Sequence, residues 1–175
     1  TLAQYGYRPI LLERGEDVDA RKETVHRFWE GEPLDTESNV QFGEGGAGAF
    51  SDGKLTTLIH DSRCRIILEE LIRAGAPGEI AYRNKPHIGT DLLRLAVKHI
   101  RRQILALGGD VRFRTKVTDL ILRDGKLTGV ILNGSEELDC GVLLPAIGHS
   151  ARDTFEMLYR HGISMSRKAF SIGVR

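Results

Sequence analysis

The stretch NVQFGEGGAGAFSDGKLTT, residues 39–57, decides how this sequence is interpreted. From Gly43 to Gly53 it holds five glycines and two alanines, and little that could pack in a core. Such a segment adds little stability, because glycine loses more conformational freedom on folding than any other residue. Glycines do let main-chain N–H groups approach a ligand, and nearby side chains such as Ser51 and Lys54 can complete the contacts.

We therefore favour a ligand-binding loop over the alternative, a flexible surface loop. The order of residues in GEGGAGAFSDGKL does not match the GxxxxGK[ST] pattern of a P-loop.

The composition is that of a soluble globular protein. The 175 residues are 41% hydrophobic and 28% charged, and the net charge of +1 gives no bias toward nucleic acid or membranes. No apolar run approaches the roughly 18 residues of a membrane span. Cys64 and Cys140 lie far apart, which argues against a disulfide framework or a metal site. We predict a cytoplasmic protein with a small-molecule substrate and without metal, nucleic acid or membrane partners.

The residues before the glycine-rich stretch indicate the second half of a βαβ unit. Thr1–Tyr5 has helical character, and Gly6 suits a C-terminal cap. Residues 8–13, RPILLE, form a short apolar run typical of a buried parallel strand. The chain thus begins within a helix, and its last residues, FSIGVR, resemble the middle of a strand. We expect an internal fragment of a longer protein.

The residues after it predict helices and then a β-meander. Helical periodicity covers residues 61–74 and 91–107. Short strands are predicted at residues 111–114, 117–123, 127–132 and 137–144. Asp124-Gly125 and Asn133-Gly134 are strong hairpin turns between the last three strands.

Glu13 ends the early strand and is the first candidate site residue. In doubly wound nucleotide-binding folds, an acid at the end of the second strand accepts hydrogen bonds from a ribose diol. Two carboxylate oxygens match the two hydroxyl donors of the diol. The alternative is a solvated acid at a strand end. The glycine fingerprint expected about 20 residues earlier would precede Thr1.

A second candidate is LLPAIGHSARD, residues 143–153, an apolar strand followed by a glycine turn and a helix. Ser150 or Asp153 could cap that helix, and the alternative is a plain strand-to-helix turn. Among six histidines, His149 has a place consistent with a site. A Ser-His-Asp hydrolase is disfavoured, because neighbours this close in sequence seldom converge as a triad.

Several strings in the chain, in this order, resemble one family: FGEGGAGAFSDGKL, KPHIGTD, AIGHSARDTFEML and KAFSIGVR. They are similar to the bacterial FAD-dependent (NAD(FAD)-utilizing) dehydrogenases, flavoproteins with two dinucleotide-binding domains. The resemblance covers nearly the whole chain. It implies an α/β FAD/NAD(P)-binding Rossmann-like fold that lacks its first strand and carries an antiparallel β-meander. It further implies a partial FAD-binding domain over 1–154, and the start of a substrate-side domain over 155–175. Within the first domain, 61–90 form a helical insertion and loop, and 117–144 form the meander.

The resemblance also implies cofactor contacts. Glu13 would bind the adenosine ribose of FAD, with Arg14 beside it, and Val117 would contact the adenine. The flavin side of the cofactor would lie along Gly45, Gly46, Ala47, Gly48 and Ser51, with Lys54 nearby. Ala146, Ile147 and Gly148 would pass close to the phosphates.

We therefore expect an FAD-dependent oxidoreductase that transfers hydride through flavin N5, with NAD(P)H as a co-substrate. His149 and Lys54 are the candidate catalytic residues. The alternatives are a non-catalytic nucleotide- or FAD-binding module, a flavin monooxygenase or an RNA-modifying flavoprotein. The fragment alone is expected to be inactive and to lack part of its FAD site. Loss of a central strand would leave sheet edges that promote self-association.

Overall fold

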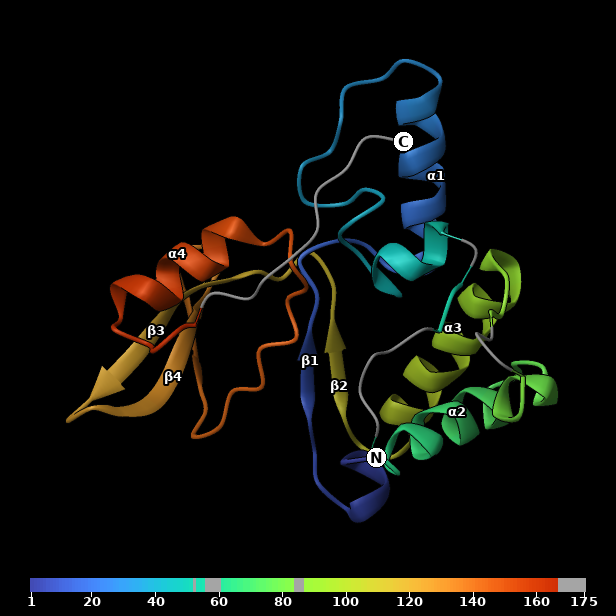
Figure 1. Ribbon diagram of the computed structural model, residues 1–175. Helices are drawn as coiled ribbons and strands as arrows, with labels where there is room; N and C mark the ends of the chain where they lie inside the picture. Colours follow the sequence, from blue (N-terminus) through green and yellow to red (C-terminus); the bar gives the residue numbers. More distant parts are fainter. Residues whose placement is uncertain (52, 56–60, 84–86, 167–175) are drawn as a thin grey trace. The chain divides into compact units, whose positions relative to one another are not determined.

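A computed structural model describes residues 1–51, 53–55, 61–83 and 87–166. The chain divides into two compact units, Thr1–Lys116 and Val117–Arg175 (Figure 1). The strand predicted at FSIGVR lies outside the described residues. In the described part of the chain, no helix is both long enough and apolar enough to cross a membrane.

The first unit contains a small parallel sheet and a group of helices. Its elements, in chain order, are η1 (Ala3–Tyr5), β1 (Ile10–Leu12), α1 (Val18–Trp29), η2 (Gly46–Phe50), α2 (Cys64–Arg73), η3 (Gly78–Ala81), α3 (Thr90–Ala106) and β2 (Asp110–Arg112). The predicted helices at 61–74 and 91–107 correspond to α2 and α3 and are confirmed. Gly6 ends η1 in the left-handed conformation, as predicted.

Strand β1 pairs with β2 in parallel, with Leu11 opposite Val111. The predicted parallel strand is therefore confirmed, but its predicted burial is wrong. Ile10 and Leu11 are 43% and 44% exposed. The physical reason is that two strands present more apolar surface than the packing of α3 on β2 covers.

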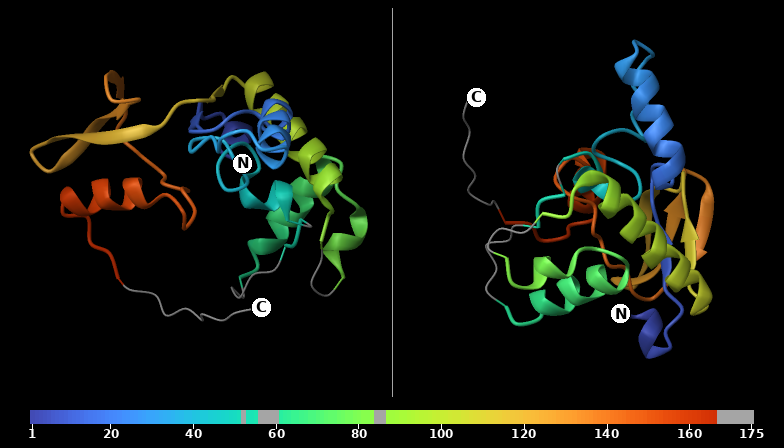
Figure 2. Two further views of the ribbon diagram at one scale, coloured as in Figure 1. Left: turned by 90° about the horizontal axis from the view of Figure 1, so that it is seen from above. Right: turned by 90° about the vertical axis from the view of Figure 1, so that its right-hand side faces the viewer.

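The core of the first unit lies among its helices rather than on its sheet. Ala76, Ile80, Ile88 and Leu93 form a buried cluster. Further apolar side chains pack against it, namely Leu55, Leu68, Leu71, Ile72 and Val97. Helices α2 and α3 are in contact, and Figure 2 shows them along one side of this unit. The glycine-rich stretch reaches this core through η2, which packs on α3.

The second unit, as far as residue 166, contains a three-stranded antiparallel sheet and a helix. Strands β3 (Val117–Arg123), β4 (Lys126–Leu132) and β5 (Glu136–Asp139) lie in the order β3-β4-β5. The two predicted turns are confirmed: Asp124 and Asn133 have φ values of 51° and 50°, and a glycine with positive φ follows each. Helix α4 (Arg152–Arg160) packs against β3. The described part of the chain is therefore mixed α/β, with a parallel sheet and an antiparallel sheet.

The segment between β5 and α4 differs from the prediction. The strand predicted at 137–144 ends at Asp139, and residues 140–150 have no regular structure. Val142 and Leu144 are 78% and 70% exposed, so among the described residues this apolar run has no strand or core to pack against. The predicted helix caps are also wrong. Ala151 occupies the capping position, because α4 begins one residue later than a Ser150 cap requires and Asp153 lies inside the helix.

Candidate functional site

Glu13 directly follows β1, and its main chain continues the parallel pairing. Its N–H donates to the carbonyl of Arg112 over 2.9 Å, and its own carbonyl accepts from the N–H of Thr115 over 2.9 Å. The Oε1 atom of its side chain accepts from the N–H groups of Gly15, at 2.8 Å, and Gly43, at 3.0 Å. The carboxylate predicted to bind a ligand therefore also ties the glycine-rich stretch to the end of the strand.

Both glycines beside this carboxylate have neighbouring atoms too close to admit a side chain. A Cβ added at Gly15 would lie 2.6 Å from the Cα of Gly43 and 2.9 Å from the carbonyl oxygen of Glu37. A Cβ at Gly43 would overlap the side chain of Arg21, and Gly43 has a φ of 117°, which side chains disfavour. This part of the stretch is thus packed between its neighbours, contrary to the alternative of a flexible loop.

Arg21, on α1, lies underneath the start of the glycine-rich stretch. Its side chain is fully buried, at 0% exposure. Its Nε donates to the carbonyl of Asn39 over 2.8 Å, and its Nη1 donates to the carbonyls of Gly43 and Glu44 over 3.2 and 2.7 Å. Burial lowers the pKa of Arg21 to about 10, so the guanidinium stays charged at neutral pH. Sequence reasoning missed this residue, because an arginine in an amphipathic helix usually faces solvent.

Phe50 lies between two arginines at the far end of η2. The guanidinium carbons of Arg21 and Arg94 are each 4.7 Å from the centre of its ring. Trp29 meets the same ring edge-on, with 6.3 Å between the ring centres. These contacts fix the end of η2 against α1 and α3.

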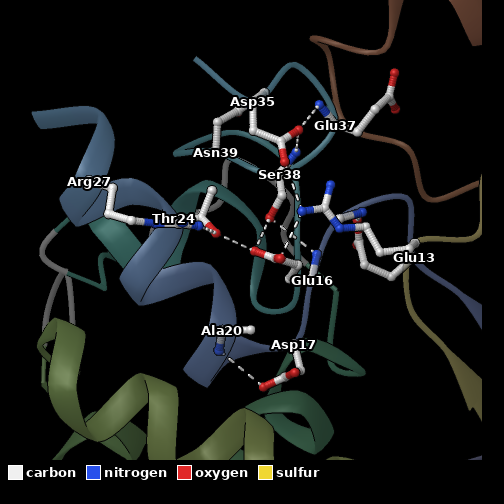
Figure 3. A network of polar contacts seen from close by, with 12 residues as sticks. Glu13, Glu16, Asp17, Ala20, Thr24, Arg27, Asp35, Glu37, Ser38 and Asn39 are labelled. Carbon is white, nitrogen blue, oxygen red and sulfur yellow. Dashed lines mark hydrogen bonds and ion pairs between the residues drawn. The ribbon is translucent and has the colours of Figure 1, made fainter. Parts of the chain in front are cut away.

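A polar network joins α1, the loop before the glycine-rich stretch and the end of β2 (Figure 3). Glu16 is at its centre: its Oε2 accepts from the hydroxyls of Thr24, at 2.6 Å, and Ser38, at 3.1 Å. Arg114 bridges Glu16 and Asp35, with its Nη2 2.7 Å from an oxygen of each. Burial opposes ionisation of Glu16, but its hydrogen bonds with Thr24 and Arg114 outweigh burial and lower its pKa.

Hydrogen bonds connect residues within the loop over residues 35–42. The Oδ1 of Asp35 accepts from the N–H groups of Glu37, at 2.9 Å, and Ser38, at 3.0 Å. The Asn39 amide donates to the carbonyl of Asp35 over 2.8 Å and accepts from the N–H of Gln41 over 2.8 Å. A hydrogen bond from Arg114 is the main cause that lowers the pKa of Asp35. These hydrogen bonds therefore fix the conformation of this segment, the 35–42 loop, next to Glu13.

Arg14, predicted to lie beside the cofactor, has partners within the 35–42 loop. Its Nε is 3.2 Å from the Oε2 of Glu37, and its guanidinium carbon is 4.4 Å from the centre of the Phe42 ring. Lys116 pairs with the same glutamate over 3.0 Å. Arg14 is thus part of the rim of the candidate site and is held in a defined orientation.

The central glycines of the glycine-rich stretch follow the 35–42 loop and lead to α3. Gly45 and Gly46 have φ values of 84° and 57°, and η2 begins at Gly46. A Cβ at Gly48 would lie 3.3 Å from Leu93, while Ala47 and Ser51 are exposed. Further along, Lys54 forms a β-bridge with His87. Lys54 and His87, with Gly89 and Thr90, line a surface pocket of about 360 Å³.

The remaining predicted site residues belong to the second unit. Val117 begins β3, opposite Leu132. Ala146, Gly148 and His149 are exposed in the irregular segment before α4, and the Nε2 of His149 is 3.4 Å from the hydroxyl of Ser150. The hydrogen-bonded site around Glu13 is therefore built from residues of the first unit. Across the described ranges, His, Cys, Asp and Glu side chains form no group of three that could hold a metal ion.

The chain is similar in sequence to a curated protein. No family model matches the chain. A curated protein of Clostridium beijerinckii, described as uncharacterized, is 61% identical over all 175 residues of the chain. The match covers 33% of that relative, so the chain spans about a third of the length of the curated protein it matches.

Proposed function

We propose that the chain forms part of the FAD site of an FAD-dependent oxidoreductase, a dehydrogenase with a Rossmann-like cofactor domain. The observation that carries this proposal is the position of Glu13. Its carboxylate lies at the carboxyl end of a parallel strand and is bonded to two glycine N–H groups of the adjoining loops. Ligands of open α/β sheets bind at the carboxyl ends of the strands.

The geometry of this carboxylate suits a ribose hydroxyl. Among the described residues, both of its side-chain hydrogen bonds fall on Oε1. Oε2 therefore remains for a ligand donor, and the two glycine N–H groups fix the orientation of the carboxylate. Charge-assisted hydrogen bonds of this kind are roughly twice as strong as neutral ones.

The rest of the proposed site follows the family resemblance. In the first unit it comprises, besides Glu13 and Arg14, the residues Gly45, Gly46, Ala47, Gly48, Ser51 and Lys54. Bound FAD would supply hydride transfer at flavin N5, with NAD(P)H as a co-substrate. The chain's own residues would bind and orient the cofactor, with Lys54 and His149 as the candidates for holding a proton. A cytoplasmic location and a small-molecule substrate are part of the same proposal.

The test uses a hybrid protein, in which this chain replaces the matching third of the C. beijerinckii relative. Calorimetry would measure the FAD dissociation constant of the hybrid and of its Glu13→Ala variant. We expect the variant to bind FAD at least about tenfold more weakly, because it loses a charged hydrogen bond to the ribose. Glu23→Ala, which changes an exposed glutamate on α1, is the matched control. Equal affinity of both variants and the unchanged hybrid would refute the role of Glu13.

A non-catalytic FAD-binding module is the main alternative. Anaerobic addition of NADH or NADPH to the FAD-loaded hybrid separates the two functions. A dehydrogenase loses its flavin absorbance under these conditions, whereas a binding module keeps it.

A further inference from the structure

We infer that Arg21 is a positioning residue that holds the glycine-rich stretch in its ligand-binding shape. This inference rests on the proposed function for the identity of the ligand. Arg21 itself is fully buried and touches the loop from the side of α1. It acts through the main chain of the loop and makes no contact with ligand.

The three hydrogen bonds of Arg21 fix the direction of three peptide groups. They end on the carbonyls of Asn39, Gly43 and Glu44. In a trans peptide the carbonyl and the following N–H point to opposite sides, and the described chain has no cis peptide. Because the Glu44 carbonyl points at Arg21, the N–H of Gly45 points away from α1. The loop thereby presents its main-chain donor on the side opposite the buried arginine.

The same residue supports the carboxylate of Glu13. Gly43 accepts from Arg21 through its carbonyl and donates to the Oε1 of Glu13 through its N–H. Its missing side chain leaves the space that Arg21 fills. Arg21, Gly43 and Glu13 thus form a continuous chain of contacts from α1 to the end of β1, and a shift of the arginine moves the acid.

The chemistry of a guanidinium is specifically required for this arrangement. A planar fork of donors can reach carbonyls on two sides, while a lysine ammonium cannot span them. The Nη2 of Arg21 is buried without a hydrogen-bond partner among the described residues. A buried donor without a partner is unfavourable, so the arginine at this position lowers the stability of the fold.

The experiment compares Arg21→Lys and Arg21→Met with Lys22→Met, a change at the neighbouring exposed position. Amide hydrogen exchange, followed by NMR in the full chain, reports on the N–H groups of Gly15 and Gly43. FAD affinity is measured in the hybrid protein. We expect both Arg21 variants to speed exchange at the two glycines and to weaken FAD binding at least about tenfold. We expect no change with Lys22→Met.

The lysine variant decides between positioning and simple charge. If Arg21→Lys restores wild-type exchange and affinity, the inference is overturned. If neither Arg21 variant folds, the wild-type chain still provides a test: a rapidly exchanging Nε proton on Arg21 would overturn the inference, and a protected one would support it. Failure of the unchanged hybrid to bind FAD would refute the proposed function alone, because exchange at Gly15 and Gly43 requires no ligand.

Discussion

Glycine has two different uses in this chain at the scale of single residues. Gly15 and Gly43 are needed because two segments of backbone and a buried arginine meet there. Gly125 and Gly134 are needed because hairpin turns require positive φ. The glycines of this stretch therefore cost conformational entropy on folding. The backbone of the stretch nevertheless takes part in the packing of the first unit.

Gly43→Ala tests this packing requirement. We expect a loss of about 2 kcal/mol or more in the free energy of unfolding, from backbone strain at positive φ and overlap with Arg21. Gly78→Ala is the control, since Gly78 has open space around it and no positive φ. Urea unfolding of the two variants gives the comparison. A Gly43→Ala chain as stable as Gly78→Ala would contradict the packing argument.

At the scale of elements, local signals in the sequence predict structure well. The Asp-Gly and Asn-Gly turns, the helices α2 and α3 and the parallel strand β1 all follow from short patterns. Helix α1 begins at Val18, directly after its cap residue Asp17. Asp17 caps this helix through the N–H groups of Asp19 and Ala20, without the glutamate or glutamine three residues on that completes a capping box.

Features that depend on distant partners could not be predicted from local patterns. The apolar residues 140–144 resemble a strand, but a strand forms only where a neighbour pairs with it. Arg21 and Arg114 are ordinary surface residues by type, and only the fold brings their carbonyl and carboxylate partners to them. Of the candidate site, the sequence therefore indicated Glu13 and the glycine-rich stretch but missed the arginines that hold them.

The bridge that Arg114 makes between elements predicts a pH dependence of stability. The pKa values of Asp35 and Glu16 are lowered in the folded chain. The resulting stabilisation is present above the ordinary carboxyl pKa and is lost as the pH falls through the lowered folded value. Because Arg114 and Asp35 are partly exposed, we expect a contribution of about 1 kcal/mol or less.

Arg114→Met should therefore reduce stability at pH 7 and flatten its decline between pH 5 and about pH 3. Arg123→Met, at an exposed end of β3, is the control. Thermal unfolding across this pH range measures the effect. An unchanged slope in Arg114→Met would show that the bridge contributes nothing.

At the scale of the whole chain, the exposed parallel sheet predicts self-association. Parallel sheets are normally covered on both faces, whereas Ile10 and Leu11 of β1 are substantially exposed. We expect the isolated chain to form dimers or larger species as its concentration rises, detectable by light scattering.

Leu11→Lys should shift this equilibrium toward monomer, because a charge on a strand blocks sheet-to-sheet association. Leu34→Lys, which changes a similarly exposed leucine outside the sheet, should leave it unchanged. A monomeric chain at all concentrations would contradict the prediction.

The central claim is that this chain belongs to an FAD site, and the absorption spectrum of the purified hybrid protein tests it most directly. The account predicts flavin bands in the visible region, present as purified or after addition of FAD and removal of the excess. A hybrid that folds, remains colourless and does not retain added FAD would contradict the account.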